Sequence, residues 1–206
     1  MGVYERFILP PLIGLACGAG PIERQRRKVV PGAQGIVLEL GFGTGLNLPH
    51  YDRSKVLRLY ALEPSPGMLV RARKAATGSD LTVEILPETA ETLSLGPASV
   101  DTVVVTYSLC TIPDPVAALA AARVVLKPGG RLLFCEHGQA PDEKVRRAQT
   151  RIEPVWKRIA GGCHLTRDIP GLIDAGGFRI DSLETMYLPR SPDWAGFNYW
   201  GVARPQ

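Results

Sequence analysis

The sequence predicts an α/β protein built on a doubly wound, mostly parallel sheet of seven strands, completed by an antiparallel closing hairpin. The first observation is a set of short apolar segments rich in Val, Leu and Ile, typical of parallel strands covered on both faces. The second is that helical segments alternate with them, which favours right-handed βαβ units. The third is a glycine-rich loop directly after the first strand, where open α/β sheets bind ligands.

Five segments are expected to be the parallel strands: Gly35–Leu40, Leu57–Leu62, Leu81–Leu86, Asp101–Thr106 and Gly130–Glu136. Two of the helices between them begin in the same way, one at Ser65-Pro66 and the other at Asp114-Pro115. In each pair the first residue is a favourable N-cap, and proline fits the first helical turn. The run Lys127-Pro128-Gly129-Gly130 is expected to end the second helix and turn the chain.

The pattern changes after Glu136. A longer basic helix is predicted over Asp142–Ile159, and a short helix over Leu172–Ala175. Two more strands are predicted over Phe178–Leu188 and Phe197–Arg204. Two closing strands after the fifth can form an antiparallel hairpin at the sheet edge, and an ordinary dinucleotide-binding fold does not end in this way.

Length and composition exclude several classes of protein. The 206 residues provide one domain, and 45% hydrophobic with 21% charged residues is typical of a soluble globular chain. The longest apolar stretch, Phe7–Gly20, contains two prolines and is shorter than the roughly 20 residues of a membrane span. The net charge of +4 is mild, and the basic residues lack the interleaved aromatic residues that nucleic acid binding would need.

The four cysteines, Cys17, Cys110, Cys135 and Cys163, lie far apart in the sequence and show no metal-ligand spacing. We therefore expect free thiols, no metal site and a cytoplasmic location. Cys110 and Cys135 fall in strand settings typical of small buried hydrophobes. Cys163 and His164 are adjacent, and adjacent side chains do not naturally face each other as a nucleophilic dyad.

The most informative stretch is Val37–Gly45, where a buried strand leads into Gly41, Gly43 and Gly45. Alternate glycines let a ligand approach the backbone, and a helix is expected to follow and direct its N–H groups at an anionic group. A dinucleotide fingerprint would have its third glycine at Leu46. The spacing therefore argues against a nicotinamide oxidoreductase.

Glu63 ends the second predicted strand, one βαβ unit after the glycine loop. A carboxylate at this position can accept two hydrogen bonds from a ribose diol. The alternative is a chance acidic residue before a turn. The pairing of Glu63 with the glycine loop favours the ribose role.

Five motifs follow one another between Gly35 and Glu136: VLELGFGTG, ALEPSPGM, AETL, SVDTVVVTYSL and RVVLKPGGRLLF. In this order they resemble class I S-adenosylmethionine-dependent methyltransferases of the type-11 group, which includes ubiquinone and menaquinone methyltransferases. Three later stretches, EHGQAP, IEPVWKRIAGGCHLTRDI and AGGF, resemble the methyltransferase-like family that includes animal alkyl-thiol methyltransferases. The resemblance implies a Rossmann-like fold, S-adenosyl-L-methionine as the cofactor and S-adenosyl-L-homocysteine as the product, with no metal needed.

The resemblance also implies the residues that bind the cofactor. Around its methionine part and ribose they are Glu39, Gly41, Phe42, Gly43, Gly45, Asn47 and Glu63. Near its adenine they are Pro64, Met68, Thr89, Ala90 and Glu91, and beside its sulfonium they are Thr106 and Tyr107. Thr89 stands where the family usually has an adenine-binding Asp, so backbone amides or Glu91 are expected to recognise the adenine.

Three residues are predicted to be catalytic: His137, Tyr107 and His164. His137 follows the fifth strand at the ligand-binding edge of the sheet, and an imidazole suits a general base, although it can also simply close the strand. His164 follows a Gly-Gly turn, where it can belong to an active-site lid or be a packed residue after a helix stop. Tyr107 can contact a substrate through its hydroxyl or simply pack.

We expect one domain with three parts: a helical lid in residues 1–30, a donor-binding core in residues 35–136, and acceptor-side helices and closing strands in residues 137–206. The predicted function is in-line methyl transfer to a small apolar acceptor, with a thiol as the first choice. The alternatives are O- or C-methylation of a quinone-like or phenol-like metabolite, and a protein that binds adenosylmethionine without turnover. The apolar N-terminal segment also allows weak peripheral membrane contact.

Overall fold

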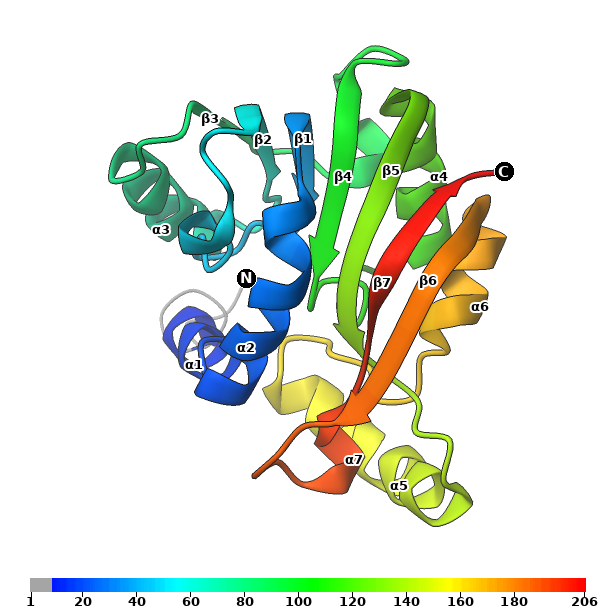
Figure 1. Cartoon of the computed structure of the whole chain (residues 1–206). Helices are drawn as coiled ribbons and strands as arrows, with labels where there is room; N and C mark the ends of the chain where they lie inside the picture. The colour runs from blue at the N-terminus through cyan, green and yellow to red at the C-terminus, as the bar shows by residue number, and fades with distance from the viewer. Residues whose placement is uncertain (1–8) are drawn as a thin grey trace.

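A seven-stranded sheet forms the centre of the computed structural model, which describes residues 9–206 (Figure 1). The strands are β1 (Gly35–Leu40), β2 (Val56–Leu62), β3 (Val83–Leu86), β4 (Val100–Thr106), β5 (Leu126–His137), β6 (Phe178–Tyr187) and β7 (Phe197–Pro205). They lie in the order β3-β2-β1-β4-β5-β7-β6. The first five pair in parallel, whereas β7 pairs antiparallel with both β5 and β6. The predicted fold class, including the closing hairpin at the sheet edge, is confirmed.

The helices are α1 (Leu9–Cys17), α2 (Gly20–Val29), α3 (Pro66–Thr77), α4 (Pro115–Val125), α5 (Glu143–Ile159), α6 (Ile169–Ala175) and α7 (Asp193–Gly196). As predicted, α3 and α4 begin at proline. The Asp114 carboxylate caps α4 by accepting the N–H of Ala117 at 2.9 Å, whereas Ser65 precedes α3 without a side-chain capping bond. The run that starts at Lys127 belongs to β5, so α4 ends one residue before that strand begins.

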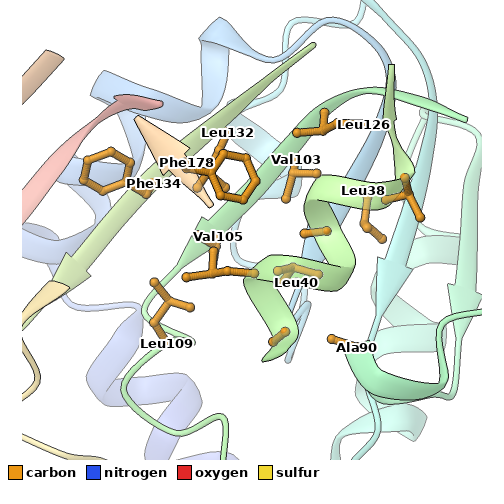
Figure 2. Packing of buried hydrophobic residues seen from close by; sticks show 14 of the residues in the cluster. Leu38, Leu40, Ala90, Val103, Val105, Leu109, Leu126, Leu132, Phe134 and Phe178 are labelled. Atoms are coloured by element: carbon orange, nitrogen blue, oxygen red, sulfur yellow. The ribbon is translucent and has the colours of Figure 1, made fainter. Parts of the chain in front are cut away.

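Two buried hydrophobic clusters cover the two faces of the sheet. Successive strand residues point to opposite faces, so Leu38 and Leu40 enter one cluster and Val37 enters the other. In the first cluster, side chains of β1, β4 and β5 pack against α4 (Figure 2). Ile169 and Ile173 of α6 belong to the same cluster. In the second, the opposite face packs against Ala72 of α3 and the residues that follow α2. Burial on both faces explains why the parallel strands are continuous apolar runs.

The strand order reverses at β1 and β4, because β2 and β3 lie on one side of this pair and β5 lies on the other. Ligands of open α/β sheets bind outside the carboxyl ends of the strands at such a switch point. Figure 1 shows α1, α2, α5 and α7 gathered at that end of the sheet. The fold therefore places the glycine loop, the segment after β4 and the end of β5 around one crevice.

The predicted helix after the glycine loop is absent from this described segment. Turns and a short 3₁₀ helix, η3 (Leu48–His50), connect β1 to β2 instead. The backbone N–H of Leu48 bonds to the Gly45 carbonyl, and Pro49 follows within η3. Proline lies in the first turn of η3, where its missing N–H is tolerated. No α-helix N-terminus faces the ligand from this loop.

The helices of residues 9–206 include none that is long and apolar enough to cross a membrane. The predicted N-terminal lid therefore has to be judged from α1 and α2, because residues 1–8 lie outside the described part. Both helices contribute residues to the wall of the crevice.

Candidate active site

A cavity of about 690 Å³ lies at the carboxyl ends of the parallel strands. This volume suits a small-molecule ligand, since such sites commonly occupy about 300–1,000 Å³. Segments after β1, β2 and β3 line one part, which we call the glycine-loop side. The other part, which we call the cysteine side, is lined by Cys110, Ile112, His137, Trp156, Cys163, Leu165 and Leu188. One continuous cavity therefore joins two chemically different walls.

The glycines of the loop have different tasks. Gly43 has a φ of 58°, and a Cβ added there would meet nothing within 4 Å, so its backbone borders open cavity. Gly45 has a φ of 80°, but a Cβ there would lie 2.8 Å from the Ala75 Cβ. Gly45 is not among the cavity-lining residues, and it keeps the loop against α3. Gly41 and Gly43 line the cavity as the sequence predicts, whereas the structure gives Gly45 a packing role.

Glu63 holds the loop and still has capacity for a ligand. Its two carboxylate oxygens accept the N–H of Gly43 at 2.7 Å and the N–H of Ser65 at 2.8 Å. A carboxylate offers about four acceptor positions, so two remain for other donors. Burial raises the pKa of Glu63, and the two N–H bonds oppose this effect. Glu63 also lines the cavity, and its binding of a diol stays a prediction.

Arg26 of α2 forms the centre of a buried polar network that sequence reasoning missed. Its guanidinium donates to the Asn47 Oδ1 at 2.8 Å and to the Thr106 hydroxyl, and it lies 5.1 Å from the Tyr107 ring centroid. Its Nε has no hydrogen-bond partner within residues 9–206 and Arg26 lines the cavity. The basic run that contains Arg26 looks like a solvated face in the sequence, so no local signal distinguishes this residue.

Asn47, expected to contact a bound methionine carboxylate, lies instead behind the cavity wall. It is buried, does not line the cavity, and donates to Glu39 Oε1 at 2.9 Å. Glu39 also accepts the Tyr51 hydroxyl at 2.7 Å. Burial outweighs these hydrogen bonds and raises the pKa of Glu39 to about 7. Arg26 thus takes the cavity position expected of Asn47, and Asn47 positions both Arg26 and Glu39.

The other predicted cofactor-binding residues line the glycine-loop side: Phe42, Pro64, Met68, Thr89, Ala90, Glu91 and Thr106. Thr89 begins the short 3₁₀ helix η4 (Ala90–Thr92), and its hydroxyl lies 3.2 Å from that of Thr92. This capping box orients the segment that stands where the family usually carries an Asp. Recognition of the adenine through the backbone or Glu91 stays a prediction.

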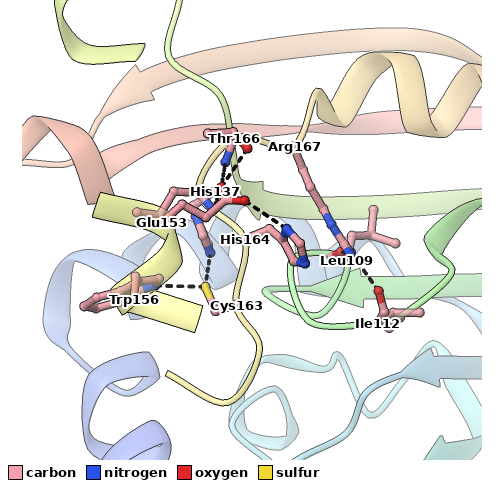
Figure 3. A network of polar contacts seen from close by, with 10 residues as sticks. Leu109, Ile112, His137, Glu153, Trp156, Cys163, His164, Thr166 and Arg167 are labelled. Carbon is pink, nitrogen blue, oxygen red and sulfur yellow. Dashed lines mark hydrogen bonds and ion pairs between the residues drawn. The ribbon is translucent and has the colours of Figure 1, made fainter. Parts of the chain in front are cut away.

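Three groups from distant segments converge on the cysteine side. The Cys163 Sγ lies 3.2 Å from the His137 Nε2, and the indole N–H of Trp156 donates to the same sulfur at 3.2 Å (Figure 3). The Cys110 Sγ, the Cys163 Sγ and an imidazole nitrogen of His137 lie within 4.8 Å of one another. The fold brings His137 to the cavity as predicted, and it places this residue beside Cys110 and Cys163, a grouping that the sequence did not predict.

Hydrogen bonding polarises this cluster. Donation from the Cys110 thiol, together with His137 and Trp156, holds the pKa of Cys163 well below its usual value. The pKa of Cys110 rises through its bond to Cys163 and through burial. Burial lowers the pKa of His137, but the Cys163 sulfur outweighs burial and raises it. The structure therefore favours a thiolate at Cys163.

Two loops that carry the cysteines are tied to each other. The N–H of His164 donates to the Cys110 carbonyl at 2.8 Å, and the Arg167 guanidinium bonds the Ile112 carbonyl at 2.8 Å. The Glu153 carboxylate accepts the N–H of Leu165 at 2.9 Å and lies 3.1 Å from the His164 Nδ1 (Figure 3). His164 is not among the cavity-lining residues. In the structure its side chain braces the loop through Glu153, and its predicted catalytic role stays a prediction.

Tyr107 lies between the two sides of the cavity. Its φ of 53° is unusual for a residue with a side chain, and such strain clusters at functional sites. Its hydroxyl bonds Asn198 Oδ1 at 2.6 Å, and burial raises its pKa well above 10. Tyr107 is therefore a neutral hydroxyl with its proton held on Asn198, which does not suit a general base.

A protein-family profile described as "Methyltransferase domain" matches residues 38–134. Thiol S-methyltransferase TMT1B of Rattus norvegicus is 36% identical over 169 residues, which cover 78% of this chain and 68% of that protein. Human thiol S-methyltransferase TMT1A is 27% identical over 173 residues, which cover 82% of this chain and 67% of that protein. Demethylmenaquinone methyltransferase of Clavibacter sepedonicus is 34% identical over 121 residues, covering 59% of this chain and 49% of that protein.

Solved structures share the fold over nearly all of the chain. A possible histamine N-methyltransferase of Thermotoga maritima superposes with a TM-score of 0.69 at 20% identity, covering 98% of each chain. A SAM-dependent methyltransferase of Leishmania major gives a TM-score of 0.69 at 17% identity, covering 97% of this chain and 80% of that one. At these identities the structural likeness speaks for the architecture alone.

Proposed function

Because this chain belongs to the class I S-adenosylmethionine-dependent methyltransferases, close to the thiol S-methyltransferases, we propose that it methylates the sulfur of a small apolar thiol. Its cofactor is S-adenosyl-L-methionine, and S-adenosyl-L-homocysteine is the product. Our proposal concerns the identity of the methyl acceptor. The observation that carries it is a cavity whose far wall is apolar and sulfur-rich, in a chain 36% identical to a protein named thiol S-methyltransferase.

The glycine-loop side fits the cofactor. When bound, S-adenosylmethionine supplies an electrophilic methyl group on a sulfonium sulfur, together with a carboxylate, a ribose diol and an adenine. Gly43 leaves space for a close approach to the backbone, and Glu63 has free acceptor positions for the diol. Arg26 provides a guanidinium with an unpartnered Nε on the cavity wall, which suits the carboxylate.

The residues proposed to contact the adenine and the sulfonium lie on neighbouring parts of the same wall. Met68, Ala90 and Pro64 offer apolar surface for the adenine, and Glu91 lies beside them for its amino group. Thr106 ends β4 and Tyr107 follows it, and both line the cavity between the two sides, where the methyl group has to cross. The methyl carbon would then point from the glycine-loop side into the cysteine side.

The cysteine side suits an apolar thiol. Ile112, Trp156 and Leu188 provide an apolar wall, and the sulfur cluster lies within it. A thiol is a few per cent thiolate at neutral pH and is intrinsically nucleophilic, so the reaction depends mainly on alignment. Holding both reactants in line and excluding water contributes up to about 7–11 kcal/mol. Ile13 and Cys17 of α1 line the same cavity, which supports a lid role for the N-terminal helices.

The test is methyl transfer from labelled S-adenosylmethionine to matched acceptors. We expect 1-butanethiol to yield its methyl thioether, and 1-butanol, which has the same chain length, to yield no ether. A phenol and a demethylquinone analogue complete the panel. Methylation of the phenol or quinone with none of the thiol would contradict a thiol acceptor. Cofactor binding without transfer to any acceptor would instead favour a binding protein.

A further inference from the structure

We propose that Cys110, His137 and Cys163 are three ligands of a zinc-type metal ion whose fourth position takes the sulfur of the acceptor. The proposal rests on thiol methylation as the function of this site. It concerns a cluster that the sequence spacing did not predict, because its members come from the segment after β4, the end of β5 and the loop after α5.

The donor set and its dimensions suit zinc. Two thiolates and one imidazole form a Cys₂His set, which zinc accepts in tetrahedral geometry with Zn–S of about 2.3 Å and Zn–N of about 2.0–2.1 Å. These bond lengths place the ligand atoms about 3.5–3.8 Å apart. The three ligand atoms here lie within 4.8 Å of one another, with 3.2 Å between the His137 Nε2 and the Cys163 Sγ. Shifts of a few tenths of an ångström to about 1 Å would complete the geometry.

The cluster is held by surrounding contacts, as metal ligands generally are. The Trp156 indole donates to the Cys163 Sγ at 3.2 Å, a contact that stabilises a thiolate ligand. A backbone bond of 2.8 Å from the His164 N–H to the Cys110 carbonyl fixes the two cysteine segments side by side. Glu153 fixes the second segment by accepting the N–H of Thr166 at 2.8 Å (Figure 3). The three ligands therefore sit on segments whose relative positions are already set.

The fourth position would open into the cavity. All three residues line it, and three protein ligands with one open position is the arrangement of catalytic zinc rather than structural zinc. The neighbouring wall is apolar, with Trp156 and Leu165 beside the cluster. A ligand for the open position would therefore come from the bound acceptor or from water.

The proposed methyl transfer conserves atoms and charge and needs no oxidant or reductant. Coordination removes the proton of the acceptor thiol to solvent, since a thiol bound to zinc is deprotonated. The sulfur then forms a bond to the methyl carbon as the bond between that carbon and the sulfonium sulfur breaks. Two neutral thioethers result, and the metal keeps its charge. The three thiolates leave the ion with a net charge of −1, which favours attack on a cationic methyl donor.

Binding of cobalt(II), which has visible absorption bands, tests the proposed metal site in the full chain. The reduced protein is titrated with cobalt(II), and we expect one equivalent to give thiolate-to-cobalt charge-transfer and tetrahedral d–d bands. Cys110→Ser and Cys163→Ser should lose these bands. Cys135→Ala, which changes a buried cysteine outside the cluster, should keep them. Calorimetry with S-adenosylmethionine establishes that each variant is folded.

Addition of 1-butanethiol should then intensify the charge-transfer band as a third thiolate binds, whereas 1-butanol should leave it unchanged. Zinc should also protect Cys110 and Cys163 of the unmutated chain from iodoacetamide, with Cys135 as the internal reference in peptide mass spectrometry. Absence of the cobalt bands, or bands that do not respond to butanethiol, would overturn the proposal.

The failure of this proposal can be told apart from failure of the proposed function. Chelator-treated protein that methylates butanethiol at an unchanged rate overturns the metal site and leaves thiol methylation standing. Cobalt bands that respond to butanethiol in a protein that transfers no methyl group to it overturn the function and leave a thiol-binding metal site.

Discussion

The two sides of the cavity are built in opposite ways. The glycine-loop side has polar groups from one stretch of the chain, since Glu39, Gly43 and Glu63 belong to β1, the loop after it and the residue after β2. The cysteine side is apolar and contains sulfur, and its groups come from Cys110, His137 and Cys163, which lie 26 residues or more apart. The residues of the glycine-loop side can be predicted from a continuous sequence motif. Those of the cysteine side come together only through the fold.

The difference follows from what each side must recognise. A cofactor with fixed chemistry can be held by loop amides, a carboxylate and one guanidinium, which need particular residues at particular spacings. An apolar acceptor is held by side chains that several helices and loops supply, and acceptor specificity therefore changes without altering the sheet. Substitutions on the two sides should accordingly separate cofactor affinity from acceptor turnover.

The largest difference between the effect on acceptor turnover and the effect on cofactor affinity is expected for His137→Ala. His137 lines the cysteine side and contacts the Cys163 sulfur, so its loss removes a group beside the proposed acceptor position. We expect kcat/KM for butanethiol to fall by about 100-fold or more, with cofactor affinity within about twofold of the unmutated protein. Steady-state kinetics and calorimetry measure the two quantities. His164→Ala is the matched control, because this histidine lies outside the cavity wall and should retain most of the turnover.

An equal loss of cofactor affinity in His137→Ala would show that the two sides are not separable. A loss in His164→Ala as large as that in His137→Ala would support the catalytic role that the sequence assigned to His164.

The contrast also explains which features could be predicted from the sequence. The continuous apolar runs, the Ser65-Pro66 and Asp114-Pro115 helix starts and the closing strands correspond to local physics, and the structure agrees with them. One local signal failed: a helix was expected after the glycine loop, and turns with the short 3₁₀ helix η3 take its place.

The surroundings of two further residues, Arg26 and Cys163, depend on tertiary contacts. Arg26 has the local sequence of an exposed basic run, yet α2 docks it onto Asn47 and Thr106. Cys163 and His164 looked like a poor dyad because they are adjacent, and the actual neighbour of Cys163 is His137, on another segment. No periodicity or spacing encodes such a contact, since it depends on how the loop after α5 packs on β5.

The second prediction concerns the charge that the glycine-loop side buries. Glu39 has a pKa of about 7 when folded, against an ordinary value of 4.5, so between these values the native state binds more protons than the unfolded state. Stability from this group is therefore full below about pH 4.5 and is lost as the pH rises through 7, by up to about 3 kcal/mol. Glu39→Gln should remove this part of the decrease in unfolding free energy between pH 5 and pH 8.

Denaturant unfolding at several pH values measures how the unfolding free energy changes with pH. Glu136 also has a pKa raised to about 7 by burial, so the variant should keep a smaller decrease of the same sign. Glu184→Gln, at an exposed position of β6, should keep the whole decrease. A Glu39→Gln protein with the slope of the unmutated chain would contradict the assignment of the buried proton to Glu39.

The third prediction tests the carboxylate that faces the cofactor. Glu63→Ala removes the acceptor of the Gly43 N–H as well as the proposed partner of the ribose diol. We expect S-adenosylmethionine to bind about 1–3 kcal/mol more weakly by calorimetry, because hydrogen bonds to a charged group are lost. Glu63→Gln keeps the shape and one acceptor, and should lose less. An unchanged affinity in Glu63→Ala would remove Glu63 from the cofactor site, and a change confined to the KM for butanethiol would move it to the other side of the cavity.

The smallest expected effect isolates a single hydrogen bond on the cysteine side. Trp156→Phe keeps an aromatic ring for the edge contact with Trp194, whose centroid is 5.3 Å away, but removes the N–H that donates to the Cys163 sulfur. We expect butanethiol turnover to fall by about 2- to 12-fold, corresponding to about 0.5–1.5 kcal/mol, with cofactor affinity unchanged. Trp194→Phe alters the same ring pair without touching the sulfur, so it should leave turnover nearly constant. If both variants lost turnover equally, packing of the ring pair would account for the effect, and the indole N–H would have no separate part in holding the Cys163 thiolate.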